Sequence, residues 1–192
     1  MVLTIRCGMK DEYNALLPSR QPGLLADVAG VEVEEYYALL EPVSVSGEWF
    51  AGTSHIWAER LKVRDKTGTQ VIARYGTSNG WLDGHPAVTV HPYGKGRVYF
   101  VGTYLDEAAQ QSLLDRIAVA AGVQPVMEVP VGVEVRKRVN AGAVEVFIVI
   151  NHERAEQLVQ LPWQAREHLS GQSVKGELKL APYGVAVLTS LA

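Results

Sequence analysis

The sequence has a single cysteine and little excess of either charge. Cys7 has no second cysteine with which to form an internal disulfide, and it cannot build a thiolate metal site alone. Eighteen Lys and Arg against 21 Asp and Glu give a net charge of −3, so the cationic excess typical of nucleic-acid-binding domains is missing. We therefore expect no internal disulfide and no nucleic-acid partner.

Long hydrophobic runs are also missing. No apolar stretch approaches the ~20 residues that a membrane span requires, and the N-terminal residues lack the pattern of a signal peptide. We therefore expect no membrane partner. One free cysteine is compatible with a reducing compartment, and the cytoplasm is the location we expect.

The histidines show no spacing that is typical of metal ligands. Zinc requires three or four converging ligands, and neither His-x-His nor His-Glu-x-x-His occurs. The five histidines are scattered over the chain as His55, His85, His91, His152 and His168. The sequence therefore predicts no metal site and no cofactor.

Motifs that could support catalysis depart from the patterns they would need. Cys7 precedes Gly8, but Ile5 replaces the first glycine of a nucleophile elbow, so we interpret Cys7 as a buried or half-buried thiol. The segment Tyr93-Gly-Lys-Gly-Arg97 lacks the glycine spacing of a phosphate-binding loop and leads into a strand, which indicates a hairpin turn.

Paired carboxylates and exposed aromatic residues are the residue types expected at a sugar site. Glu32, Glu34 and Glu35 lie together, but on an exposed strand face they are expected to be solvated charges, not a glycosidase pair. We therefore predict no catalytic residue. Trp81, in the turn-rich loop 79–84, is the best candidate for an exposed aromatic that stacks on a sugar ring, although packing is the commoner role of such residues.

The amino-acid composition indicates a folded protein. Hydrophobic residues make up 47% of the 192 residues and charged residues 20%, which is typical of globular domains. A chain of this length holds one ordinary domain or two small ones. It is too short for a complete (β/α)₈ barrel, which needs about 250 residues.

The first part of the chain combines strands with two helices. Alternation and turn residues predict strands at 2–6, 31–35, 57–63, 71–75, 86–91 and 97–101. The first strand begins without a lead-in, as expected of a chain cut from something longer. On the apolar face of 57–63, Glu59 is the one polar exception. Turns are expected at 65–68 and at 93–96.

Two helices are expected beside these strands. Pro22 and Gly23 open a short helix over 24–29, which Gly30 ends. Apolar residues at helical spacing predict a longer helix over 104–121, closed by Gly122. Its apolar stripe is expected to pack on a sheet, which gives a layered α/β arrangement.

Helical signals end near Gln124-Pro125. Beyond this point strands are predicted at 131–139, 143–150, 156–161, 174–180 and 184–188, with turns at 140–142 and 182–184. We therefore expect an α/β domain over 1–124 and a small antiparallel β-sandwich over 125–192, packed on one another.

Several segments together resemble the C-terminal half of β-galactosidases of glycoside hydrolase family 42. For the first domain they are Arg6-Cys-Gly-Met-Lys-Asp-Glu-Tyr-Asn14, Pro22-Gly23, Gly30-Val-Glu-Val-Glu-Glu-Tyr36, Trp57-Ala-Glu-Arg-Leu61, Val71-Ile-Ala-Arg-Tyr75, Gly84-His-Pro-Ala-Val-Thr89 and Tyr93–Thr103. For the second they are Gly132-Val-Glu-Val135, Val149-Ile-Asn-His152 and Leu180–Leu188. The similarity covers nearly the whole chain in the family's order.

The resemblance implies an assembly role. The family hydrolyses terminal β-galactosides with two glutamates on an N-terminal barrel, one of them following an asparagine, whereas the four asparagines here precede Ala, Gly, Ala and His. The family's trimerisation domain resembles a class I glutamine amidotransferase (flavodoxin-like) fold, and this chain covers part of it.

Two functions therefore stay open. One is a non-catalytic oligomerisation portion of a β-galactosidase, which forms a dimer or trimer and partners an N-terminal catalytic barrel. The other is a stand-alone module that binds carbohydrate or protein.

Overall fold

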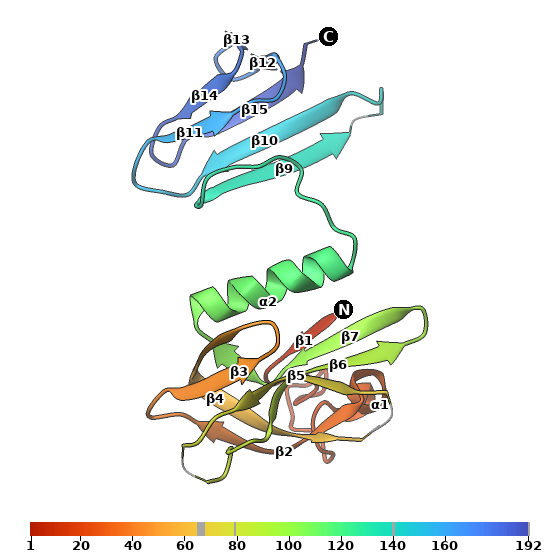
Figure 1. Ribbon diagram of the computed structural model, residues 1–192. Coiled ribbons are helices and arrows are strands. Elements are labelled where there is room, and N and C mark those ends of the chain that lie inside the picture. The colour runs from red at the N-terminus through yellow and green to blue at the C-terminus, as the bar shows by residue number, and fades with distance from the viewer. Residues whose placement is uncertain (65–67, 79, 140, 192) are drawn as a thin grey trace. The chain divides into compact units, whose positions relative to one another are not determined.

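The computed structural model describes residues 1–64, 68–78, 80–139 and 141–191. These residues form two compact units, Met1–Gly122 and Val123–Ala192, and most of the regular structure in both is β-strand (Figure 1). Of the turn predicted at 65–68 only Gly68 is described, and the turn predicted at 140–142 begins outside the described residues. None of the helices within the described ranges is both long and apolar enough to cross a membrane.

The first unit is built on an eight-stranded sheet. Its strands are β1 (Val2–Thr4), β2 (Val31–Ala38), β3 (Val43–Gly47), β4 (Ala51–Val63), β5 (Gln70–Tyr75), β6 (Pro86–Tyr93), β7 (Gly96–Val101) and β8 (Thr103–Leu105). The order is β1-β7-β6-β5-β3-β4-β2, and β8 pairs with β4. The β1–β7 pair is parallel, whereas the other pairs between described strands of this sheet are antiparallel.

The segment that contains β7 and β8 curls this sheet back on itself. β7 pairs with β6. After the single residue Gly102, β8 pairs with β4, which lies three strands beyond β6 in the sheet order. The Glu59 N–H donates to the Gly102 carbonyl at 2.7 Å, and the Tyr75 hydroxyl donates to the same carbonyl at 2.9 Å. The β4 strand is therefore held beside the junction of β7 and β8.

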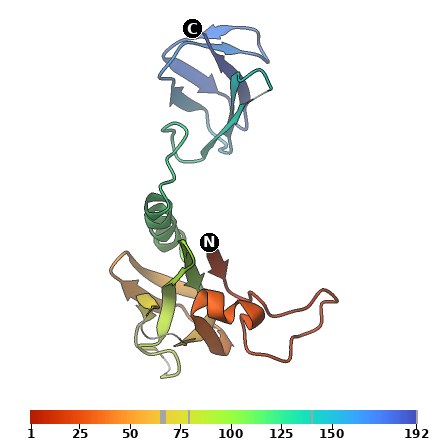
Figure 2. The ribbon, with the colours of Figure 1, turned by 90° about the vertical axis from the view of Figure 1, so that its right-hand side faces the viewer.

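The short predicted helix is present as a 3₁₀ turn, η1 (Gly23–Leu25), followed by α1 (Ala26–Ala29). Gly30 ends it at φ +67°, a left-handed conformation that glycine adopts without strain. Figure 2 shows the loop between β1 and η1 projecting from the sheet beside α1. The prediction of a helix that ends at Gly30 is confirmed.

The long helix is shorter than predicted at its N-terminus. α2 spans Glu107–Ala120, and residues 103–105 belong to β8 instead. Asp106 caps the helix because its side chain accepts the Ala109 N–H at 2.9 Å. The predicted start at 104 was wrong because Leu105 happens to lie four residues before Ala109, in phase with the apolar stripe.

The apolar stripe of α2 packs as predicted. Ala109, Leu113 and Ile117 are buried in one cluster with residues of the sheet. A second cluster, which includes Leu3, Val31 and Phe100, is joined by residues of α1 and its flanks. The first unit therefore has two apolar clusters, and its core does not depend on α2 alone.

The second unit is a small β-sandwich. Its strands are β9 (Val133–Val139), β10 (Glu145–Asn151), β11 (Gln157–Gln160), β12 (Ala165–Glu167), β13 (Ser173–Val174), β14 (Glu177–Leu180) and β15 (Val185–Ser190). A five-stranded sheet, β13-β12-β15-β10-β9, and a two-stranded sheet, β11-β14, share one apolar cluster. The five predicted strands are found, but β12 was missed, and the strand predicted over 174–180 is divided between β13 and β14.

The fold class was predicted in part. The β-rich second unit and the helix packed on the first sheet are present, but the described pairs of the first sheet are antiparallel except for β1–β7, which does not confirm a flavodoxin-like layer. The sequence over 43–54 contains three serines, two glycines and a threonine, which are weak strand signals, so β3 and the start of β4 were not recognised.

Candidate functional site

An apolar groove lies between β1, β8 and α2 of the first unit. Its volume is about 360 Å³. Its lining is mostly apolar and consists of Val2, Thr4, Ile5, Val101, Thr103, Tyr104, Leu105, Gln110, Leu113 and Leu114. Tyr104 is 52% exposed and Leu114 is 42% exposed, so large apolar groups at this groove remain accessible to a partner.

The strand at the groove's border lies at the end of the sheet. Among the described strands, β1 pairs with β7 alone and stands at one end of the strand order. Leu3 points into the cluster around α1, whereas Val2 and Thr4 line the groove on the other face. An open strand edge beside accessible apolar side chains is suited to pairing with another chain.

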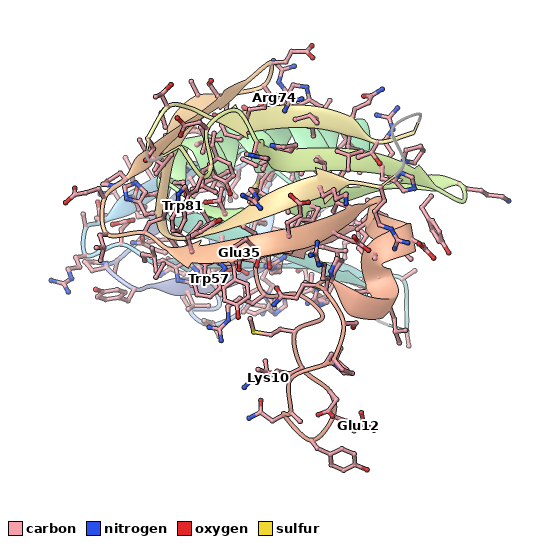
Figure 3. All side chains as sticks on the ribbon, turned by 90° about the horizontal axis from the view of Figure 1, so that it is seen from below. Lys10, Glu12, Glu35, Trp57, Arg74 and Trp81 are labelled. Carbon is pink, nitrogen blue, oxygen red and sulfur yellow. The ribbon has the colours of Figure 1, made fainter. Side chains whose placement is uncertain are left out.

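A second cavity of the first unit is lined by aromatic and charged side chains. It has a volume of about 510 Å³, and its lining is Glu35, Tyr36, Tyr37, Arg60 and Trp81. We call it the aromatic cavity. Trp81 is 61% exposed, which confirms the prediction that it is an exposed aromatic residue. Figure 3 shows Glu35, Trp57 and Trp81 close together on this unit, with Lys10 and Glu12 out on the projecting loop.

The aromatic rings of this region contact one another in pairs. Tyr36 stacks on Trp57 with ring centroids 5.1 Å apart and planes 15° apart. Tyr37 packs against Trp81 at 5.5 Å with an angle of 53°. The Arg6 guanidinium lies over the Trp57 ring, 5.4 Å from its centroid. Tyr36 and Tyr37 are neighbours on β2 and point to opposite faces of the sheet, so the Tyr36–Trp57 pair with Arg6 forms an aromatic surface on one face and the Tyr37–Trp81 pair lies on the other.

Glu59 supports this surface from inside the sheet. Its side chain is fully buried, and its Oε1 accepts the Arg6 N–H at 2.7 Å and the Trp57 Nε1–H at 3.3 Å. Within the described part of the chain, its Oε2 has no hydrogen-bond partner. Burial raises the pKa of the Glu59 carboxyl, against the lowering effect of these hydrogen bonds and of the Arg6 charge.

Of the three glutamates predicted to be solvated, Glu32 and Glu34 form ion pairs. Glu34 pairs with Arg60 at 3.4 Å, and Glu32 pairs with Arg64 at 3.6 Å, both across the β2–β4 ladder. The register of the β2–β4 pair shifts between Val33 and Glu35, so Glu35 does not continue the alternation of Glu32 and Glu34 along β2. Glu35 borders the aromatic cavity instead. The bulge therefore changes which side chains of β2 face outward.

Cys7 and the hairpin turn behave as the sequence indicated. Cys7 is a half-buried free thiol whose pKa is raised by burial and by the nearby Glu59 charge, which disfavours a thiolate nucleophile. Gly94 and Lys95 connect β6 to β7 as a two-residue turn. In the described ranges no group of three or more His, Cys, Asp or Glu is placed to hold a metal ion.

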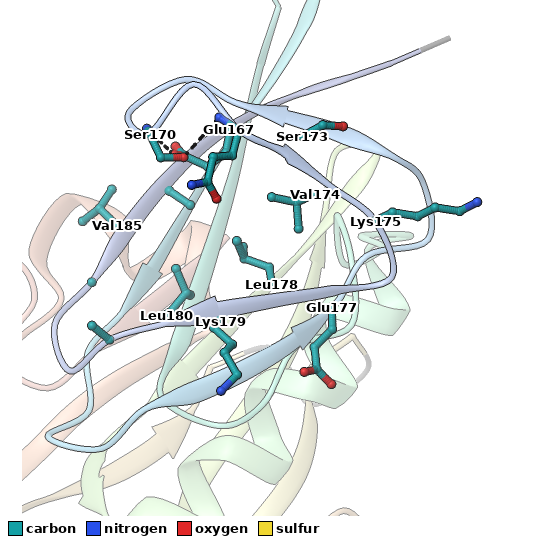
Figure 4. A pocket seen from close by; sticks show the side chains of 14 residues that line it. Glu167, Ser170, Ser173, Val174, Lys175, Glu177, Leu178, Lys179, Leu180 and Val185 are labelled. Carbon is teal, nitrogen blue, oxygen red and sulfur yellow. Dashed lines mark hydrogen bonds between the residues drawn. The ribbon is translucent and has the colours of Figure 1, made fainter.

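The second unit has a polar pocket at the mouth of its sandwich (Figure 4). Its volume is about 630 Å³ and it lies beside Glu167, Ser170 and Lys179. Burial alone would raise the pKa of Glu167, but hydrogen bonds from the Ser170 side chain and from three backbone N–H groups lower it to about 2. Glu167 is therefore committed to holding the loop after β12.

Sequence reasoning found Trp81 but missed the other parts of the aromatic cavity. The polar residue Glu59 on an apolar strand face was the one available signal, since a buried charge requires partners. The pairing of Tyr36 with Trp57 depends on the β2–β4 register, which the sequence does not reveal.

Comparison with known proteins assigns both units. Residues 1–124 match the family model described as the β-galactosidase trimerisation domain, and residues 132–190 match the β-galactosidase C-terminal domain. The chain is 34% identical to β-galactosidase BglY of Alicyclobacillus acidocaldarius over 98% of its length, and 30% identical to β-galactosidase LacZ of Heyndrickxia coagulans over 94%.

Solved structures give the same result. The crystal structure of β-galactosidase from Bacillus circulans sp. alkalophilus matches 99% of the chain with a TM-score of 0.83 and 26% sequence identity. The chain spans 28% of the Alicyclobacillus protein, 27% of the Heyndrickxia protein and 29% of this solved chain. The similarity is therefore to one portion of longer proteins.

Proposed function

Because the chain belongs to the glycoside hydrolase family 42 β-galactosidases, as their trimerisation domain followed by their C-terminal domain, we propose that it is their non-catalytic assembly portion. In this role the first unit joins copies of the chain into a dimer or trimer. It also positions a catalytic barrel that hydrolyses terminal β-galactosides. The relatives that the chain matches are β-galactosidases, which supports this parent activity.

The apolar groove beside β1 is the observation that carries the proposal. It combines an open strand edge with accessible apolar side chains of α2 and β8 in the domain whose family is named for trimerisation. Apolar patches of this kind commonly mark protein interfaces. We assign self-association to this groove.

The proposal extends to the fold of the first unit, to the domain boundary and to the location of the protein. We propose that the first unit is the C-terminal part of an amidotransferase-like domain, with the parallel β1–β7 pair belonging to its sheet. We place the domain boundary near residue 124 and the protein in the cytoplasm. The parallel pair supports the first of these because antiparallel strands alone would not be expected in a flavodoxin-like sheet.

The oligomeric state tests the assembly role. We expect multi-angle light scattering of the purified chain to give a dimer or trimer at micromolar concentration. Leu114→Glu places a charge in the groove, so this variant should be monomeric. Val119→Glu is the matched control, because Val119 is an exposed apolar residue of the same helix that does not line the groove. A wild-type monomer, or equal effects of both variants, would show that the groove is not the assembly surface.

A further inference from the structure

The aromatic cavity shares no lining residue with the groove, and its size suits a small ligand. Its volume of about 510 Å³ lies within the ~300–1,000 Å³ of typical ligand pockets. Three of its five lining residues are aromatic, namely Tyr36, Tyr37 and Trp81, and the other two are charged. We propose that this cavity is a non-catalytic saccharide-binding site.

The aromatic residues supply faces on which a sugar ring can rest. The faces of aromatic rings carry negative charge, and they attract the weakly positive C–H groups that a pyranose presents on one side. Trp81 is 61% exposed and therefore remains accessible to a ligand. The contact of Tyr37 with Trp81 restrains both rings before a ligand arrives.

The charged residues favour a neutral ligand that is rich in hydroxyl groups. Glu35 offers carboxylate oxygens that accept hydrogen bonds, and Arg60 offers guanidinium N–H groups that donate them. Because the two charges are opposite, their effects on an ionic ligand largely cancel, and the lining gives no net attraction to an anion or to a cation. A sugar can satisfy both residues, since each hydroxyl donates and accepts a hydrogen bond.

Glu59 orients the Tyr36–Trp57 pair on the opposite face of the sheet. It accepts the Trp57 indole N–H from within the sheet, and Trp57 in turn stacks under Tyr36. The same carboxylate oxygen accepts the Arg6 N–H, and the Arg6 guanidinium lies over Trp57. The orientation of Tyr36 therefore depends on a buried group, and the β2 strand that carries Tyr36 also carries Glu35 and Tyr37 of the cavity.

Saturation-transfer difference NMR on the full chain tests the proposal. The probes are D-galactose, D-glucose and lactose at millimolar concentrations. We expect saturation transfer to at least one sugar, and we expect Trp81→Ala to weaken its binding about tenfold, which corresponds to about 1.4 kcal/mol. Tyr93→Ala is the matched control, because Tyr93 is a 53% exposed aromatic residue at the end of β6 that does not line the cavity.

The possible outcomes separate this proposal from the assembly role. Binding that Trp81→Ala weakens and Tyr93→Ala leaves unchanged supports the site, whatever the oligomeric state of the chain. No saturation transfer to any of the three sugars overturns it, as does binding that both variants weaken equally. If no sugar binds and Trp81→Ala changes the oligomeric state, the cavity is an interface between copies and the proposal is wrong.

Discussion

At the scale of single residues, Glu59 is the most informative side chain in the molecule. It is fully buried on β4, and it holds both the backbone of Arg6 and the ring of Trp57. Arg6 has φ +63°, a left-handed conformation that costs free energy for a residue other than glycine. The hydrogen bond from its N–H to Glu59 helps to fix that conformation, so one carboxyl links the start of the projecting loop to the aromatic surface.

Glu59 should make stability depend on pH in a direction opposite to that of a salt-bridged carboxylate. Its pKa is raised above 4.5 in the folded protein, so its contribution is fully present below the unfolded-state pKa and is lost as pH rises through the folded-state pKa. In Glu59→Gln this dependence disappears. Above pH 4.5 the unfolding free energy of Glu59→Gln should therefore increase relative to that of the wild type, by at most about 1.4 kcal/mol per pH unit.

Urea denaturation followed by tryptophan fluorescence at a series of pH values measures this difference. Glu34→Gln is the control, because Glu34 lies on the neighbouring strand in partly exposed ion pairs and should change stability by ~1 kcal/mol or less. A wild-type stability that rises with pH relative to Glu59→Gln would contradict the raised pKa.

At the scale of elements, Asp106 decides where β8 ends and α2 begins. Its side chain accepts the Ala109 N–H at 2.9 Å, and its second oxygen accepts the Thr53 N–H of β4. These two hydrogen bonds, of which the one from Ala109 is the stronger influence, lower the pKa of the Asp106 carboxyl. One residue therefore caps the helix and joins it to the sheet that it covers.

Replacing Asp106 should weaken this junction. We expect Asp106→Ala to destabilise the first unit by ~1–2 kcal/mol at neutral pH, because it removes the cap and leaves the Thr53 N–H without its acceptor. Asp106→Asn keeps an oxygen at the cap and should lose less. Since the pKa is lowered, the stabilisation is present above the unfolded-state pKa and is lost as pH falls through the folded-state pKa.

Far-UV circular dichroism during urea denaturation measures this effect, since α2 is the long helix of the described chain and belongs to the first unit. Equal stability of Asp106→Ala and wild type at neutral pH would show that the cap does not hold the helix start.

At the scale of the whole molecule, each buried carboxylate of the described residues serves the structure of its own unit. Among the described residues, Glu59 and Glu167 are the buried carboxylates, and they belong to different units. Each is occupied by hydrogen bonds from its own unit. Retaining glycosidases require two carboxyl groups about 5–5.5 Å apart in one site. The chain also spans 28% or less of the two curated relatives described above.

We therefore expect the isolated chain to have no glycosidase activity. A chromogenic β-galactoside, incubated with the purified chain and, as a positive control, with an equimolar amount of a full-length relative, provides the measurement. Turnover by the chain that persists after host enzymes are removed would contradict the assembly role.

The sequence by itself determined the features that depend on local pattern. The helix end at Gly30 follows from glycine's tolerance of positive φ, and the β6–β7 hairpin follows from alternation around Gly94 and Lys95. The buried stripe of α2 follows from helical spacing. Ordered motifs along the chain were sufficient to identify the family, because a family match depends on residue order and not on contacts.

Tertiary structure alone decided the features that depend on strand register and on contacts between distant segments. The bulge after Val33 brings Glu35 to the aromatic cavity, and the β2–β4 pairing sets Tyr36 against Trp57. The return of β8 to β4 makes residues 103–105 a strand, although their spacing fits a helix. One residue of register shift moves a strand's side chains to the other face, and no local pattern in this sequence specifies that shift.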